Sequence, residues 1–159
     1  MVRILRTFLM VLLAFFAVFL LLSVLRHRLR LKQEAQASSP PGKLVSSGGG
    51  RIHVYSEGSG EKTIVFLSGH GTAYPTLDFK PLWNRLSDTY RVVVVERPGY
   101  GWSDVTDAPR DLETILGETR DGLAAAGENG PFVLMPHSMA GLEALYWMQK
   151  FPEEIEAMI

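Results

Sequence analysis

The chain contains no cysteine, which excludes disulfide bonds and thiolate ligands for a metal ion. Its four histidines are scattered and match no usual spacing of a metal site, so the sequence predicts no metal centre. The lack of cysteine leaves the cellular compartment open, because cysteine-free domains occur on both sides of a membrane. The sequence also lacks a periodic repeat, and its 159 residues correspond to one domain.

Charged residues are absent from Thr7 to Leu25, where Leu, Phe, Val and Ala predominate. As a helix this segment is roughly 28 Å long, close to the hydrocarbon thickness of a bilayer. We favour a retained single-pass anchor. A cleaved signal peptide is the second interpretation, but its apolar core is usually about 7–15 residues long, and the small-residue pattern at Ala35–Ala37 lies far beyond the segment. A buried core helix is the least favoured, because no polar stripe interrupts the segment.

Basic residues flank this apolar segment, and more of them follow it than precede it. Arg3 and Arg6 precede the segment, and Arg26, Arg28, Arg30 and Lys32 follow it. Since positive charge prefers the cytoplasm, the count weakly favours a cytoplasmic C-terminal domain. The net charge of the chain is -1, so we expect the basic cluster to contact the anionic headgroups of a lipid bilayer and not nucleic acid.

Composition divides the chain into three parts. Residues 1–32 form the N-terminal membrane anchor with its basic flank, residues 33–43 form a polar linker, and residues 44–159 form a soluble domain. Apolar runs predict strands over residues 43–47, 51–57, 63–68, 91–96 and 132–137, and a further run covers 155–159. Helical periodicity predicts helices over residues 78–88, 111–126 and 139–151. After an initial hairpin the strands alternate with helices, which predicts an α/β fold with a mostly parallel sheet and helices on both faces.

Active sites in such sheets lie beyond the C-terminal ends of the strands. Three unusual turns are expected at these ends: residues 68–71, 96–101 and 137–139. In the last turn, Ser138 stands where a buried strand breaks into a helix within VLMPHSMAG. Such a turn exposes a serine hydroxyl above the sheet, next to the free amides of a helix N-terminus. The usual pattern is G-x-S-x-G. Here Pro136 and Ala140 replace the glycines, so an ordinary N-capping serine remains an alternative.

The three turns together resemble those of the α/β-hydrolase superfamily. Leu67–Gly71 is a glycine-bearing loop after a strand, Arg97–Asp104 is similar to the family's R-P-G-x-G-x-S turn, and His137–Met139 is similar to its nucleophile elbow. The order and spacing of the turns also match, and the resemblance covers roughly residues 44–159. It implies the N-terminal part of an incomplete α/β-hydrolase sheet, preceded by one transmembrane helix, in a membrane-anchored hydrolase of the serine type.

The resemblance also implies roles for individual residues. Ser138 would be the nucleophile, and the backbone N–H of Met139 would be one donor of the oxyanion hole. The second donor would be the backbone N–H of His70 if the loops are aligned at the strand end, or that of Thr72 if they are aligned by residue identity. We prefer His70, because the strand length determines where the loop starts. No cofactor is implied.

Other polar residues of these turns receive structural interpretations. His137 is expected to pack beneath the elbow and not to act as the base, because successive residues of a strand point to opposite faces. Glu96 and Arg97 are expected to be structural and to hold the turn by hydrogen bonds, in preference to a role in binding substrate.

The acid and the base of a serine triad are not evident in the sequence after Ser138, where the family has Asp or Glu followed by His. No histidine occurs there. We therefore expect the N-terminal half of a hydrolase of ester or amide bonds, acting on a small-molecule or peptide acyl substrate, and we expect the 159-residue chain alone to be inactive. The alternative is a non-catalytic truncated product or a membrane-tethered binding module.

Overall fold

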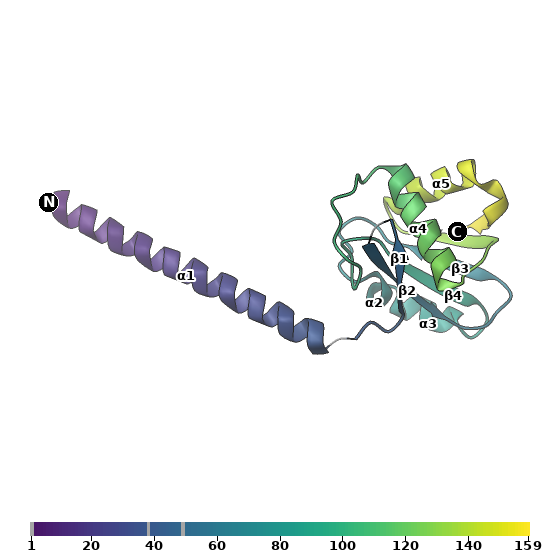
Figure 1. Ribbon diagram of the computed structural model, residues 1–159, viewed down its shortest axis with the longest axis horizontal. Coiled ribbons are helices and arrows are strands. Elements are labelled where there is room, and N and C mark those ends of the chain that lie inside the picture. Colours follow the sequence, from purple (N-terminus) through teal and green to yellow (C-terminus); the bar gives the residue numbers. More distant parts are fainter. Residues whose placement is uncertain (1, 38, 49) are drawn as a thin grey trace. The chain divides into compact units, whose positions relative to one another are not determined.

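The computed structural model describes residues 2–37, 39–48 and 50–159. It divides the chain into two compact units, Met1–Ser39 and Pro40–Ile159, which are described separately. The first unit consists of the helix α1 (Val2–Ala37), drawn in purple and blue in Figure 1. The helix therefore continues beyond residue 33, where the sequence predicts the start of a linker.

Helix α1 is long and apolar enough to cross a membrane. The qualifying stretch is Val2–Gln33, with a mean hydropathy of 3.1 in its apolar window. Signal sequences and the core helices of soluble proteins meet the same criteria of length and composition. The structure thus supports a helix that can span a bilayer, and the choice among these three uses remains a prediction.

The second unit is built on a mixed sheet with the strand order β1-β2-β4-β3-β5-β6. Its strands are β1 (Lys43–Ser47), β2 (Gly50–Glu57), β3 (Thr63–Leu67), β4 (Arg91–Glu96), β5 (Phe132–Pro136) and β6 (Ile155–Met158). Strands β1, β2 and β4 pair antiparallel, whereas β4, β3, β5 and β6 pair parallel. Each predicted strand is present, with both ends within one residue of its prediction.

Helices cover both faces of the sheet, because its strands are apolar on both sides. The helices α4 (Leu112–Ala126) and α5 (Ala140–Lys150) pack on the face that carries Val93 and Val95 of β4. On the other face, Trp83 packs against Val92 and Val94. Side chains alternate along a strand, so one run of valines supplies both layers. The predicted α/β class is confirmed.

The helix predicted over residues 78–88 is observed as the shorter α3 (Lys80–Leu86), and a further short helix, α2 (Pro75–Asp78), precedes it. Pro81 has no N–H to donate to the carbonyl of Leu77, so a continuous helix would lack that hydrogen bond. The indole Nε1 of Trp83 in α3 donates a hydrogen bond of 2.8 Å to the carbonyl of Thr76 in α2, which holds the two helices together.

Two edges of the sheet are distinguished below. The C-terminal edge comprises the loops that follow β3, β4 and β5, namely residues 68–71, 97–104 and 137–139. The N-terminal edge comprises the segments that precede β4, β5 and β6, namely residues 87–90, 127–131 and 151–154, the last of which includes the short 3-10 helix η1 (Pro152–Glu154). The parallel register pairs Leu67 with Val95 and with Pro136, so the three loops of the C-terminal edge start side by side.

Candidate active site

Ser138 occupies a sharp turn between β5 and α5, and its side chain is exposed at the C-terminal edge. Its φ is 57°, and no other non-glycine residue in the described part of the chain has a positive φ. This left-handed conformation costs an L-residue about 1–2 kcal/mol, so the surrounding structure must enforce it. An ordinary N-capping serine has an extended backbone instead, and the N-cap position of α5 belongs to Met139.

Helix α5 begins at Ala140, immediately after the turn. Ala140 is completely buried in the core between the helix and the sheet, where a larger side chain would separate the two. The carbonyls of His137 and Ser138 accept hydrogen bonds from Ala140 and Gly141 at 3.2 and 3.0 Å. The N–H of Met139 has no acceptor among the residues that the structure describes, so the predicted oxyanion donor is available.

Pro136 replaces the first glycine of the usual pattern, and the sheet explains why proline is tolerated there. The N–H of His137 donates to the carbonyl of Leu67 in β3 at 2.9 Å. Two residues before Pro136, the carbonyl of Leu134 accepts from Ile159 on the opposite side, at 3.0 Å. Because backbone groups alternate along the strand, Pro136 faces the β6 side, beyond the last residue that pairs with β6. Its missing N–H therefore breaks no hydrogen bond of the described ladder.

The loop after β3 lies directly against the elbow. A Cβ atom placed on Gly69 would stand 3.1 Å from the Cβ of Ser138 and 3.1 Å from Nδ1 of His137, so a larger residue there would require these neighbours to shift slightly. The next residue, His70, has an exposed side chain, and its N–H has no acceptor among the described residues. The N–H of Gly71 donates to Oη of Tyr100 at 3.2 Å. The geometry therefore brings the His70 end of the loop to Ser138, while the prediction that His70 is the donor is still to be tested.

Arg97 connects this loop to the helix that follows Ser138. Its Nη2 donates to the carbonyls of Ser68 and Gly69, the latter at 3.2 Å, and its Nη1 pairs with the carboxylate of Glu143 on α5. Both charged side chains are buried. Burial raises the pKa of Glu143, and the nearby positive charge of Arg97 opposes this shift without cancelling it. The predicted structural role of Arg97 is therefore present, but its side chain binds the loop after β3 and helix α5 instead of its own turn.

Glu96 holds the turn as predicted. Its Oε1 accepts from the N–H of Thr76 at 3.1 Å, and its Oε2 accepts from the N–H of Trp102 at 2.9 Å. Nδ1 of His53 lies 3.1 Å from the same Oε2. Burial alone would raise the pKa of Glu96, but the hydrogen bonds outweigh it and the pKa is lowered. Gly101 completes the turn with φ 50°, and a Cβ there would lie 1.9 Å from Oε2.

Sequence reasoning missed the role of His53, which is completely buried beneath this turn. Its Nε2 accepts a hydrogen bond of 3.0 Å from the N–H of Gly42, so the proton of the neutral ring belongs on Nδ1, facing Glu96. The contact depends on the antiparallel pairing of β2 with β4, in which His53 lies opposite Glu96. No local pattern in the sequence signals such a pair.

His137 does not pack beneath the elbow, and this prediction is wrong. Its side chain is exposed, and its ring stands edge-on to Phe79 with 6.4 Å between the ring centres. Strand β5 ends at Pro136, so the alternation of faces on which the prediction depended no longer applies at position 137.

Three of the glutamates after Ser138 form ion pairs with basic side chains. Glu143 pairs with Arg97, Glu154 with Arg120, and Glu156 with Lys62. Within the described residues, no group of His, Asp or Glu side chains could hold a metal ion. The described residues thus supply a candidate nucleophile and two amides, and none of them is assigned as base or acid.

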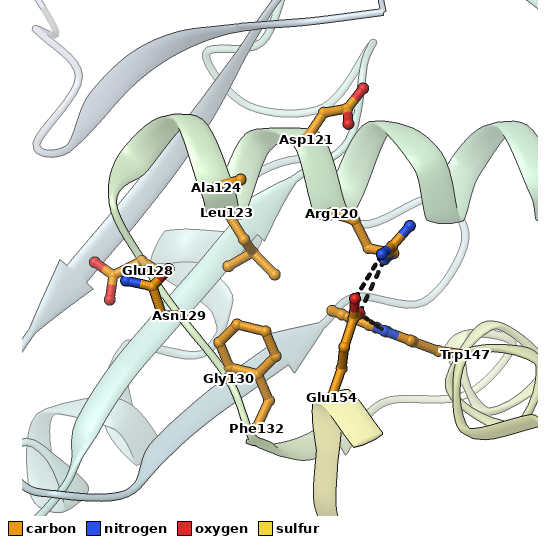
Figure 2. Close-up of a pocket in the computed structure, with 10 residues that line it drawn as sticks. All are labelled: Arg120, Asp121, Leu123, Ala124, Glu128, Asn129, Gly130, Phe132, Trp147 and Glu154. Atoms are coloured by element: carbon orange, nitrogen blue, oxygen red, sulfur yellow. Dashed lines mark hydrogen bonds and ion pairs between the residues drawn. The ribbon is translucent and has the colours of Figure 1, made fainter. Parts of the chain in front are cut away.

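Cavities occur at both edges of the sheet. At the C-terminal edge, a cavity of about 350 Å³ is lined by residues that include His70, Arg97, Tyr100 and Arg110. At the N-terminal edge, a cavity of about 250 Å³ lies beside α4. In it, Glu154 accepts hydrogen bonds from Arg120 and Trp147 (Figure 2). The first of these cavities adjoins the loop that contacts Ser138.

Known proteins similar to this chain include hydrolases. No protein-family model matches the chain. It is 43% identical over 146 residues to the uncharacterized protein YbdG of Bacillus subtilis (strain 168), a match that covers 90% of this chain and 45% of YbdG. It is 25% identical over 108 residues to the 2-(acetamidomethylene)succinate hydrolase of Mesorhizobium japonicum, covering 68% of this chain and 37% of that enzyme. The chain therefore spans less than half the length of these relatives.

A solved structure of similar architecture is the meta-cleavage product hydrolase CumD of Pseudomonas fluorescens IP01, in its S103A mutant. It superposes with a TM-score of 0.68 at 16% sequence identity, covering 75% of this chain and 44% of CumD. At this identity the likeness concerns the fold alone. The second unit has the fold of α/β-hydrolase enzymes, as the resemblance of its three turns implies.

Proposed function

We propose that this chain carries the nucleophile of a serine hydrolase of ester or amide bonds, and that the nucleophile is Ser138. The observation that carries the proposal is the left-handed backbone of Ser138 at the end of a central strand. Backbone strain of this kind clusters at active sites, where the fold over-determines it. The alternative of a binding module offers no reason for a strained serine to be exposed at this edge.

In the proposed reaction, Oγ of Ser138 attacks the carbonyl carbon of a small-molecule or peptide acyl substrate. The carbonyl oxygen becomes negatively charged and accepts hydrogen bonds from the backbone N–H groups of Met139 and His70. Loss of the leaving group yields an acyl-enzyme, and water then releases the acid. The reaction requires a general base to take the proton of Ser138, and that base is not assigned to a described residue.

The test uses the polypeptide expressed from its complete reading frame and a fluorophosphonate probe, which reacts covalently with activated serines. We expect labelling at Ser138, located by mass spectrometry of the digested protein. Ser138→Ala should abolish labelling, whereas Ser103→Ala, at a serine whose hydroxyl is hydrogen-bonded to the Glu96 carbonyl, should retain it if the protein folds. Labelling that persists in Ser138→Ala, or that is absent from the wild type, would refute the assignment.

We also propose that α1 is a single-pass membrane anchor and that the second unit faces the cytoplasm. The apolar length of α1 and the basic residues from Arg26 to Lys32 support this proposal. The basic residues would lie among the anionic headgroups of the lipid bilayer.

This topology can be measured on the 159-residue chain, because it contains no cysteine. In that chain, Glu61→Cys introduces a single thiol at an exposed position between β2 and β3. We expect a membrane-impermeant maleimide to label it only after the cells are lysed, and we expect the protein to remain in the membrane pellet after alkaline extraction. A mature protein that begins after α1 would instead show that the segment is a cleaved signal peptide.

A further inference from the structure

The guanidinium of Arg97 contacts two elements of the candidate site, the loop after β3 and helix α5. Its Nη2 donates to two successive carbonyls, those of Ser68 and Gly69, and its Nη1 pairs with Glu143. The guanidinium carbon also lies 5.0 Å from the ring centre of Tyr100. A planar guanidinium can make these contacts at once, whereas the single ammonium of a lysine lacks such a fork.

The hydrogen bond to Gly69 determines the direction of the next amide. In a trans peptide the C=O of one residue and the N–H of the next point in opposite directions. Since the carbonyl of Gly69 points to Arg97, the N–H of His70 points away from it. Gly69 itself abuts Ser138. The following amide, of Gly71, is held by Tyr100 from the same turn.

We propose that Arg97, held by Glu143, is the positioning residue of the oxyanion hole. It fixes the peptide between Gly69 and His70 so that the N–H of His70 faces the oxygen that becomes negative during attack by Ser138. This inference depends on the proposed function. Because Glu143 lies on α5, which starts two residues after Ser138, the pair connects both donor loops in one rigid arrangement. Donors that are already oriented need no rearrangement in the transition state.

The test compares the double variant R97M/E143M with the wild-type protein from the complete reading frame, using p-nitrophenyl acetate as the substrate. The double change removes both buried charges together, so that neither is left uncompensated, and it removes the hydrogen bonds to the loop. We expect kcat to fall by about 100-fold, as when one oxyanion donor is lost. We expect KM to change by less than about twofold, because the donor acts mainly in the transition state.

A matched control removes a second Arg–Glu pair at the N-terminal edge. Arg91 pairs with the buried Glu128 and donates to the carbonyl of Gly58 at 2.9 Å, so its contacts are of the same kind. The variant R91M/E128M should retain the wild-type kcat. An unchanged kcat in R97M/E143M, or an equal fall in both double variants, would overturn the positioning role.

If the double variant does not fold, the variant R97K provides a second test. Lysine keeps a positive charge beside Glu143 but lacks the several N–H donors of the guanidinium. We expect kcat to fall by about tenfold with KM nearly constant. An unchanged kcat in R97K would overturn the proposal. The proposed function fails separately: if the wild-type protein is not labelled by fluorophosphonate at Ser138, the nucleophile is wrong and the positioning role falls with it.

Discussion

Both edges of the sheet contain residues with a left-handed backbone, but the surroundings of these residues differ. At the N-terminal edge, Gly127 adopts φ 86° at the end of α4, and no atom would touch a Cβ placed on it. At the C-terminal edge, Gly101 adopts φ 50° against a buried carboxylate, and Ser138 adopts φ 57° without being glycine. The left-handed backbone at Gly127 thus only terminates a helix, whereas at Gly101 it is packed against a buried side chain, and at Ser138 it is adopted by a residue that carries a Cβ.

One Arg–Glu pair at each edge can be compared in the same way, although Arg91–Glu128 at the N-terminal edge also has a buried carboxylate. At the N-terminal edge, the side chains of Arg120 and Glu154 are 32% and 28% exposed, and they line an open cavity (Figure 2). At the C-terminal edge, those of Arg97 and Glu143 are 5% and 7% exposed. Water can replace a lost partner at the first pair but not at the second. Removal of one partner is therefore expected to cost more stability at Arg97–Glu143 than at Arg120–Glu154.

The largest expected effect comes from substituting the glycine that touches the buried carboxylate. Gly101→Ala places a Cβ 1.9 Å from Oε2 of Glu96 and strains the backbone at φ 50°. We expect a loss of about 3–5 kcal/mol in the free energy of unfolding, measured by urea denaturation. The matched change Gly127→Ala meets open space, so only the backbone strain of about 1–2 kcal/mol remains. Equal losses in the two variants would contradict the contrast between the edges.

A smaller effect is expected from Glu96→Gln. This change replaces one carboxylate oxygen by an NH2 group, which cannot accept the hydrogen bond that a backbone N–H donates to that oxygen. We expect a loss of about 2–3 kcal/mol near neutral pH. The pKa of Glu96 is lowered by folding, so its ionised form stabilises the native state above the unfolded value of 4.5, and this contribution is lost as the pH falls through the folded value. The difference between wild type and Glu96→Gln should therefore shrink as the pH falls below about 4.5, because protonated Glu96 resembles Gln.

The control for this pH dependence lies at the N-terminal edge. Glu154 also has a lowered pKa, chiefly because Arg120 donates to it, but both side chains are partly exposed. We expect Glu154→Gln to lose less stability than Glu96→Gln and to show a weaker dependence on pH. Urea denaturation at a series of pH values measures both variants, and a larger effect at Glu154 would reverse the proposed order of the edges.

The smallest expected effect concerns Ser138 itself. Ser138→Gly removes the strain of φ 57°, whereas Ser138→Ala keeps a Cβ in the left-handed region. We expect the glycine variant to be more stable than the alanine variant by about 1 kcal/mol, after allowance for the greater entropy of unfolded glycine. At Ser87, where φ is -65°, the order should reverse and alanine should be the more stable. The same order at both serines would show that Ser138 carries no strain.

Much of the fold could be predicted from the sequence. The four valines of β4 indicated a strand covered on both faces, and the turn residues marked the ends of elements within one or two positions. The helix predicted over residues 111–126 is observed as α4, with Asp111 as its N-cap, accepting from the N–H of Thr114, and Gly127 as its left-handed C-cap. These features depend on neighbours a few residues apart, which a sequence displays directly.

Less of the candidate site could be predicted. The position of Ser138 and the approach of the 68–71 loop followed from the motifs and the strand order. The partners of Arg97 did not, since Ser68 and Glu143 are 29 and 46 residues away. The orientation of His137 was also missed, because the strand ends one residue before it.

The sequence by itself determined the elements, their order, the apolar helix α1 and the serine at the break after β5, because each of these depends on local pattern and periodicity. Only the tertiary structure decided which charges are buried together, which amides remain free, and that Ser138 must adopt a left-handed backbone. These properties arise when strands far apart in the sequence end at the same edge, where their loops pack against one another and bury polar groups.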